Sequence, residues 1–200
     1  MSAAPEVVSL AAGARVPGRP FTDPGATLAD LEALALIRSA QRKRLARGQG
    51  TGTWKGRDGA VHWLVAPAPA RLLEAEPCLA VGFFGQARED VDHTTLVELE
   101  HAMLERPEEL PGLLSYHNVR LADGQWGNLV LFEGDADTAL LRSEPHHADA
   151  IARTPAHYHS LRLHRGLLPD GPLGRREVEL RTTLYLDFAD APPWRAVRSA

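Results

Sequence analysis

Two neighbouring stretches of the sequence, residues 113–120 and 126–132, alternate apolar side chains with polar, aromatic and titratable ones. Because side chains on a strand point alternately to opposite faces, each stretch gathers its polar groups on one face. Hydroxyl, amide and guanidinium groups held on strands could bind a phenolate or enolate and shield it from water. We therefore predict general acid–base chemistry, or cofactor-independent oxygenation of a flat aromatic substrate. The candidate catalytic residues are Tyr116, Asn118, Arg120, Trp126 and Asn128.

The same alternation also has a purely structural interpretation. Any antiparallel sheet with one face in solvent alternates polar and apolar residues in this way. The sequence alone leaves both interpretations open.

A tight hairpin is predicted between the two stretches, because Ala122-Asp123-Gly124-Gln125 contains Asp-Gly, a strong signal for a short turn. Before the hairpin, the apolar run 78–86 predicts a buried strand, and residues 94–106 predict a helix. One face of that helix carries Leu96, Leu99 or Glu100, Met103 and Leu104. After the hairpin we expect a short helix over 135–142, a second helix from Pro145, and strands over 157–168 and 177–188.

The composition divides the chain into four segments. Residues 1–26 hold four prolines among small residues and predict a flexible arm. Residues 27–76 predict an N-terminal extension, in which a helix capped by Thr27 is followed by a second hairpin. The main domain covers residues 77–188, and residues 189–200 form a proline-rich tail.

Two features of the extension leave alternatives open. The basic triplet at residues 42–44 is typical of a solvated helix end, where the helix dipole favours cations, but it could also be a nucleic-acid patch. Asp58-Gly59 and the strand after it weakly repeat Asp123-Gly124 and its strand. The extension could therefore be a degenerate second copy of the main domain.

Strand, helix, hairpin, helix and strand over residues 77–188 is the β-α-β-β-α-β order of a ferredoxin-like unit. In this order these residues resemble the dimeric α/β-barrel superfamily, which includes antibiotic-biosynthesis-type monooxygenases, heme-degrading oxygenases and chlorite-dismutase-like heme proteins. The resemblance implies an α+β fold, an antiparallel sheet with helices on one face. Two such sheets pair, often in a homodimer, and enclose a pocket. The polar face of the strands would then line that pocket, on the side away from the helices.

Histidine is enriched: five of the nine histidines lie between residues 146 and 164. A heme would need one axial imidazole in an apolar pocket, and His147, His159 and His117 are the cofactor-binding candidates. In the heme-degrading relatives an Asn of the first strand works with a Trp and a helical His. Here the first strand, CLAVGFFGQ, has no Asn, while Trp126 and Asn128 lie on the third strand. The alternative is that these histidines are surface or hydrogen-bonded residues.

A metal site would need two or three imidazoles that converge with a carboxylate. The sequence has neither an HExxH motif nor a Cys/His finger spacing, so we assign no metal ligand. It also lacks the glycine-rich dinucleotide and phosphate motifs and the nucleophile elbow, which disfavours those classes of enzyme. The cofactor stays unknown, with heme as the candidate.

The bulk composition narrows the class further. Hydrophobic residues make up 44% of the chain and charged residues 24%, as in soluble globular proteins. The net charge of −4 favours neither nucleic acid nor an anionic membrane as a partner, and no apolar run is long enough to span a bilayer. The single cysteine, Cys78, excludes an internal disulfide and is expected in the core. Without a signal-peptide pattern, we expect a cytoplasmic protein.

Together these features predict a small-molecule-binding α/β-barrel protein that acts on an apolar or aromatic ligand. Its activity would be that of a heme-binding or cofactor-independent, monooxygenase-type oxidoreductase, although the sequence leaves open whether it is an enzyme. The alternative is a non-catalytic ligand-binding or stress-related protein of the same fold. The expected partners are a small molecule and a second copy of the chain.

Overall fold

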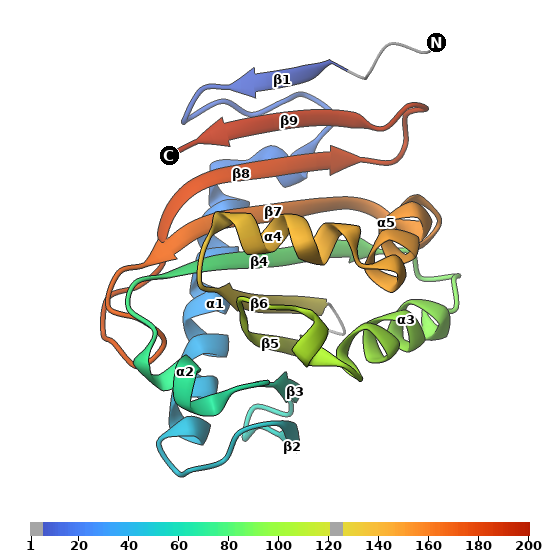
Figure 1. Ribbon diagram of the computed structural model, residues 1–200. Helices are drawn as coiled ribbons and strands as arrows, with labels where there is room; N and C mark the ends of the chain where they lie inside the picture. Colours follow the sequence, from blue (N-terminus) through green and yellow to red (C-terminus); the bar gives the residue numbers. More distant parts are fainter. Residues whose placement is uncertain (1–5, 121–125) are drawn as a thin grey trace.

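A computed structural model describes residues 6–120 and 126–200, and in these ranges nine strands form one sheet (Figure 1). The strands follow the order β1–β9–β8–β7–β4–β6–β5–β3–β2 across the sheet. Their bounds are β1 Val7–Leu10, β2 Gly52–Lys55, β3 Val61–Val65, β4 Cys78–Ala87, β5 Leu113–Arg120, β6 Trp126–Phe132, β7 Tyr158–Leu168, β8 Glu179–Asp187 and β9 Trp194–Ser199.

The centre of the sheet is a ferredoxin-like unit. Its four strands lie side by side in the order β7–β4–β6–β5, and each neighbouring pair is antiparallel. The helix α3, Thr94–Leu104, connects β4 to β5, and α4, Asp135–Ser143, and α5, Pro145–His157, connect β6 to β7. The predicted α+β fold and its element order are therefore confirmed. The predicted turn at residues 122–125 lies outside the described residues.

Further strands extend the unit at both edges. The hairpin of β2 and β3 joins through β3, which pairs with β5, and a short helix, α2, Pro69–Glu74, leads from β3 to β4. On the other edge, β8 and β9 follow β7, and β1 pairs with β9 in parallel. Residues 7–10 and 194–199 are thus strands where we expected arm and tail. Both strands are short, and β1 exposes most of its side chains, so pairing with the sheet rather than local alternation defines them.

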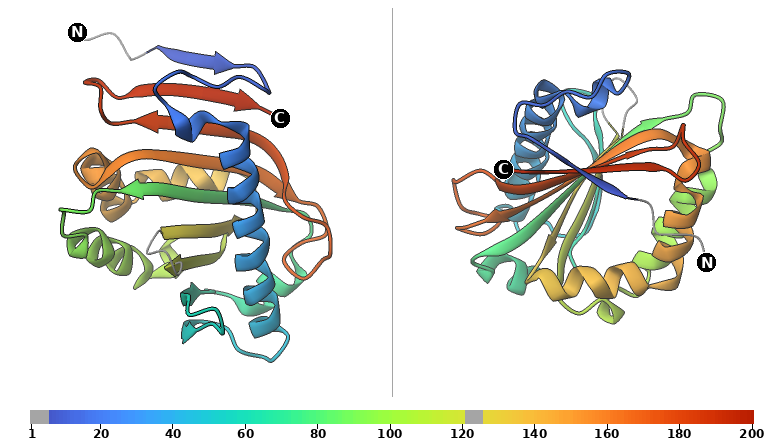
Figure 2. Two further views of the ribbon diagram at one scale, coloured as in Figure 1. Left: turned by 180° about the vertical axis from the view of Figure 1, so that it is seen from behind. Right: turned by 90° about the horizontal axis from the view of Figure 1, so that it is seen from above.

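The two faces of the sheet carry different helices (Figures 1 and 2). Helices α3, α4 and α5 cover one face, and α1, Pro24–Leu45, crosses the other. The resemblance had predicted that the second face is open to a pocket; in the structure α1 covers it. None of the helices in the described ranges combines the length and hydrophobicity that a membrane crossing requires.

Helix α1 begins four residues earlier than expected. The N-cap is Asp23, whose carboxylate accepts a hydrogen bond from the backbone N–H of Gly25, and Pro24 occupies the first helical position. The expected cap, Thr27, lies within the helix and is hydrogen-bonded to the hydroxyl of Tyr185 at 3.1 Å. Thr27 was a plausible choice because threonine is also a common N-cap residue.

Apolar contacts hold α1 on the sheet. Leu34 and Ile37 are 1% exposed and belong to one core cluster with Leu129 and Leu131 of β6. Gly82 of β4 allows this close approach, because a Cβ atom at this position would lie 2.8 Å from a methyl group of Leu34.

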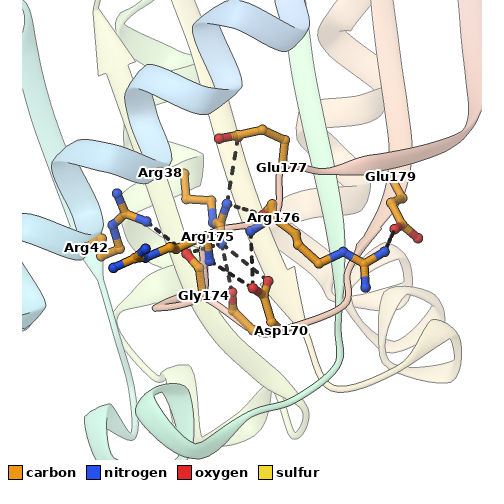
Figure 3. Close-up of polar contacts among 9 residues, drawn as sticks. Arg38, Arg42, Asp170, Gly174, Arg175, Arg176, Glu177 and Glu179 are labelled. Atoms are coloured by element: carbon orange, nitrogen blue, oxygen red, sulfur yellow. Dashed lines mark hydrogen bonds and ion pairs between the residues drawn. The ribbon is translucent and has the colours of Figure 1, made fainter.

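A buried arginine also fixes α1 to the loop between β7 and β8 (Figure 3). Arg38 is 3% exposed and donates hydrogen bonds to the carbonyl oxygens of Gly171, at 3.1 Å, and Gly174, at 2.8 Å. Burial lowers the pKa of Arg38, and Glu177 and Asp170 oppose that change. The guanidinium thus provides hydrogen bonds for loop carbonyls that packing against α1 would otherwise bury without a partner.

Candidate functional site

The candidate site lies between α3 and the strands β5 and β6. Asn118 of β5 and Asn128 of β6 are directly opposite each other in the sheet, so their side chains share a face. Tyr116 lies two positions along β5 on the same face, and Glu100 of α3 lies over it. Tyr116, Asn118 and Asn128 are buried, and Glu100 is partly buried.

Hydrogen bonds fix the orientation of these four side chains. The amide nitrogen of Asn118 donates to both carboxylate oxygens of Glu100, at 3.0 and 2.8 Å. The amide nitrogen of Asn128 donates to the hydroxyl of Tyr116 at 3.2 Å, and its oxygen accepts the backbone N–H of Phe83 at 3.1 Å. Each amide is therefore held in one orientation, with its donor group toward the oxygen of an ionisable side chain.

Burial changes the acidity of this cluster. It raises the pKa of Glu100 to about 7, and hydrogen bonding from Tyr116 and Asn118 limits the rise. Burial also raises the pKa of Tyr116, and the neighbouring Glu100 adds to that change. Burial and Glu100 together raise the pKa of Tyr158 to about 12. Near neutral pH, Glu100 can therefore bind and release a proton while the two phenols stay protonated.

A groove of about 620 Å³ runs along α3 beside this cluster. Residues 91–94 and the outer side of α3 form one wall, and Arg120 and Trp126 contribute from the ends of β5 and β6. Two groove residues, Val97 and His101, flank Glu100 on the helix. Glu100 itself does not line the groove, but α3 carries both this carboxylate and the residues of one groove wall.

Three of the groove residues, His101, Arg120 and Trp126, take part in ring contacts. The ring of His101 lies 4.3 Å from that of Trp63, centroid to centroid. The guanidinium carbon of Arg120 is 5.9 Å from the ring centroid of Trp126. Flat apolar surface and positive charge are thus adjacent, as binding of an aromatic anion requires.

The five residues proposed from the sequence lie in one region of the structure. Tyr116, Asn118 and Asn128 belong to the buried cluster, while Arg120 and Trp126 line the groove. The face that they share is the one under α3, whereas we expected the face away from the helices. Alternation along a strand defines two faces, but it cannot tell which of them a distant helix will cover.

Glu100 is the residue that the sequence analysis did not select. Its signal was present, because Glu100 lies three and four residues before Met103 and Leu104, which are 4% and 6% exposed. A carboxylate on the apolar stripe of a helix must be paired or change its pKa. That argument could have identified Glu100 before the structure.

The three candidate cofactor histidines lie apart from one another. His117 is fully buried on the α1 face, where its Nε2 is 3.1 Å from Nδ1 of His62. His147 lies at the start of α5 and donates its backbone N–H to Glu144, and His159 is exposed at the start of β7. None of them lines the groove along α3.

These positions do not fit a heme. The Nε2 atom of His117 is engaged by His62 beneath α1, and burial lowers the pKa of His117 to about 3. A heme needs only one axial imidazole, but none of the three lines the groove along α3, so none is placed to bind a heme there. Within the described ranges, no three His, Cys, Asp or Glu side chains form a group that could hold a metal ion.

Comparisons with known proteins gave similarity at the level of three-dimensional structure. No protein-family model matches the sequence, and a search of curated proteins gave no match. Rv0793 from Mycobacterium tuberculosis is similar with 21% identity and a TM-score of 0.35, over 42% of this chain and 84% of its own. A dimeric protein of unknown function and ferredoxin-like fold from Bacteroides fragilis NCTC 9343 is similar with 12% identity and a TM-score of 0.32, over 42% and 89%.

A third similar structure is a "putative monooxygenase" from Lactobacillus acidophilus NCFM. It shares 12% identity and a TM-score of 0.39, over 64% of this chain and 52% of its own. The ferredoxin-like assignment itself rests on the strand order and connectivity described above.

Proposed function

We propose that the protein binds a small aromatic molecule with an ionisable hydroxyl group in the groove along α3, and that Glu100 accepts the proton of that hydroxyl. The observation that carries this proposal is a carboxylate with a pKa of about 7, held by Asn118 on α3, the helix that also forms one wall of a groove with aromatic and cationic residues. A general base is most effective when its pKa lies near the working pH.

The proton balance of this step is simple. The hydroxyl loses its proton to the Glu100 carboxylate, which becomes a carboxylic acid, and the ligand becomes a phenolate. Arg120 at the groove supplies a positive charge for the phenolate oxygen. Tyr116 and Tyr158, whose pKa values are raised, stay protonated and do not compete for the proton.

Such a proton transfer is the first step of cofactor-independent oxygenation. A phenolate activates a neighbouring ring CH₂ group toward dioxygen. One oxygen atom becomes a ring carbonyl, the other leaves as water, and the substrate supplies all the electrons. We therefore propose a monooxygenase-type oxidoreductase as the activity. Binding without turnover is the second candidate, favoured by the two hydrogen bonds that Asn118 already gives to Glu100.

The test uses 4-nitrophenol, whose anion absorbs visible light and whose neutral form does not. In buffer near pH 7, where part of Glu100 is ionised, we expect binding to the wild-type protein to increase the anion signal, because ionised Glu100 takes up the proton. Glu100→Gln should still bind the probe, but its increase in anion absorbance should be about tenfold smaller. A tenfold change corresponds to about 1.4 kcal/mol in the free energy of ionising the bound probe. Glu98 on the same helix lines the groove, so Glu98→Gln is the comparison: it should keep the increase, and its loss there but not in Glu100→Gln would assign the proton to Glu98 and refute the role of Glu100.

Oxygen uptake with 1,8-dihydroxyanthrone, which has both ionisable hydroxyl groups and a ring CH₂ group, then separates the two candidates. Consumption that depends on Glu100 supports the oxygenase, and a probe response without consumption supports binding alone. No probe binding, or an anion signal unchanged in Glu100→Gln, would refute the proposal.

A further inference from the structure

The outer side of α1 carries an exposed stripe. Figure 2 shows that α1 runs along the outside of the molecule with its outer side uncovered by other elements. Leu28 and Leu36 on this helix are 62% and 71% exposed, the two most exposed large hydrophobic side chains of the described residues. Leu36 leaves apolar surface in water, and association with a partner would remove it.

The stripe has the spacing of a helix–helix contact. Its positions are separated alternately by three and four residues, the spacing with which two helices pack side by side. They are Ala29, Glu32, Leu36, Ser39 and Lys43. All five are at least partly exposed. Only Leu36 is large and apolar, so the stripe would allow two helices to approach closely.

This stripe is complementary to itself in the antiparallel direction. When Leu36 lies opposite Ser39 of a second copy, Glu32 lies opposite Lys43 of that copy. Both pairs have the same midpoint along α1, between residues 37 and 38. The twofold axis repeats each contact, so one arrangement gives two opposite-charge pairs and two Leu–Ser contacts. A parallel arrangement would instead bring Glu32 against Glu32 and Lys43 against Lys43, which is unfavourable.

The position of α1 also affects how two copies of the chain could associate. The sheet face away from α3, α4 and α5 is the one through which two such sheets could pair, and α1 closes it. Asp30 and Arg38 hold α1 in place there through buried polar contacts. Face-to-face pairing of two sheets is therefore blocked on this side by α1.

We propose that the protein forms a homodimer through antiparallel packing of α1 against α1 of a second copy. Leu36 lies at the centre of the contact, and the Glu32–Lys43 pairs set its direction. This proposal is independent of the ligand-binding role of the groove, because α1 and α3 lie on opposite faces of the sheet.

Sedimentation velocity of the full-length chain over a range of concentrations tests the proposal. We expect a dimer for the wild type, and at least about a tenfold weaker association for Leu36→Arg, because a charged group would replace the apolar centre. Ile151→Arg is the matched control. Ile151 is 49% exposed on α5, so the same change there should leave association unaltered.

Charge reversal tests the direction of the helices. Glu32→Lys and Lys43→Glu should each weaken the dimer several-fold, because like charges then face each other. The double variant should restore association, since the opposite-charge pairs are rebuilt with reversed sign. Circular dichroism confirms that each variant is folded, as expected for exposed positions.

Three outcomes would overturn the proposal. One is a wild-type monomer at every concentration. Another is a dimer that Leu36→Arg leaves intact, which would place the contact elsewhere. The third is a double variant that associates no better than the two single ones, which would exclude the antiparallel pairing.

Discussion

The two faces of the sheet both bury carboxylates, but they treat the charge differently. Under α1, Asp30 is paired with two partners, the guanidinium of Arg162, 2.9 Å away, and Nε2 of His164, 2.8 Å away. Under α3, the hydrogen-bond donors to Glu100 among the described residues are neutral groups. A paired charge stabilises a contact, whereas a buried charge without a cationic partner changes its pKa and can exchange a proton.

The α1 face also shows that residue types alone do not make a catalytic site. Asp30, His164 and Thr183 form an acid–imidazole–hydroxyl array, with 2.9 Å between Nδ1 of His164 and the Thr183 hydroxyl. His164 and Thr183 are each 1% exposed, so a substrate cannot reach the hydroxyl. The array anchors α1 to the sheet, while Glu100 lies on α3, whose other residues form a wall of a groove.

The largest expected effect is on the α1 face. Asp30→Ala removes the carboxylate and leaves Arg162 and His164 without their acidic partner. Breaking a buried ion pair in this way costs about 3–5 kcal/mol of unfolding free energy. Urea denaturation measures it, with Asp149→Ala as the control. Asp149 pairs with Arg153 on the surface, and its loss should cost less than about 1 kcal/mol. Equal losses in the two variants would contradict the comparison.

The next effect is the acid sensitivity of the α1 face. Burial lowers the pKa of His117 from 6.5 to about 3, so between these values the unfolded chain binds a proton that the folded protein does not. Stability from this group is therefore present above pH 6.5 and is lost as pH falls, by about 1.4 kcal/mol per unit. His117→Leu should remove this slope from denaturation measured between pH 4 and 6.5. An unchanged slope would show that His117 is protonated in the folded state.

The smallest expected effect is on the α3 face, where the unfolding free energy should change with pH in the opposite direction. The pKa of Glu100 rises from 4.5 to about 7, so between these values the folded protein holds a proton that the unfolded chain has released. Stability from this group therefore falls as pH rises through this window, by about 1 kcal/mol per unit for a partly exposed carboxylate. Glu100→Gln should remove the decline. In the wild type the slopes of His117 and Glu100 offset each other between pH 4.5 and 6.5. A variant as pH-sensitive as the wild type would contradict the assignment.

Much of the fold could be predicted from local pattern. The apolar run of β4 and the alternation in β5, β6, β7 and β8 located each strand to within a few residues. The prolines that begin α1 and α5 occupy the first helical position, which suits the fixed backbone angle φ of proline. The strands β1 and β9 were missed, because a short edge strand is defined by the neighbour with which it pairs. The domain boundaries proposed from composition stay a prediction.

Part of the candidate site was also predictable. Tyr116, Asn118 and Asn128 share a face because side chains alternate along a strand, and this required no tertiary information. Glu100 was not selected, because its importance comes from contact with Asn118, eighteen residues later in the chain and on another element.

By itself, the sequence determined which residues form strands and helices and which side chains share a face, since both follow from periodicity along one segment. Only the tertiary structure decided that α3 lies over the polar face of β5 and β6 and that α1 lies over the opposite face. The physical reason is that a helix is positioned by contacts between segments far apart in the chain, such as Leu34 against Gly82 and Arg38 against the loop after β7.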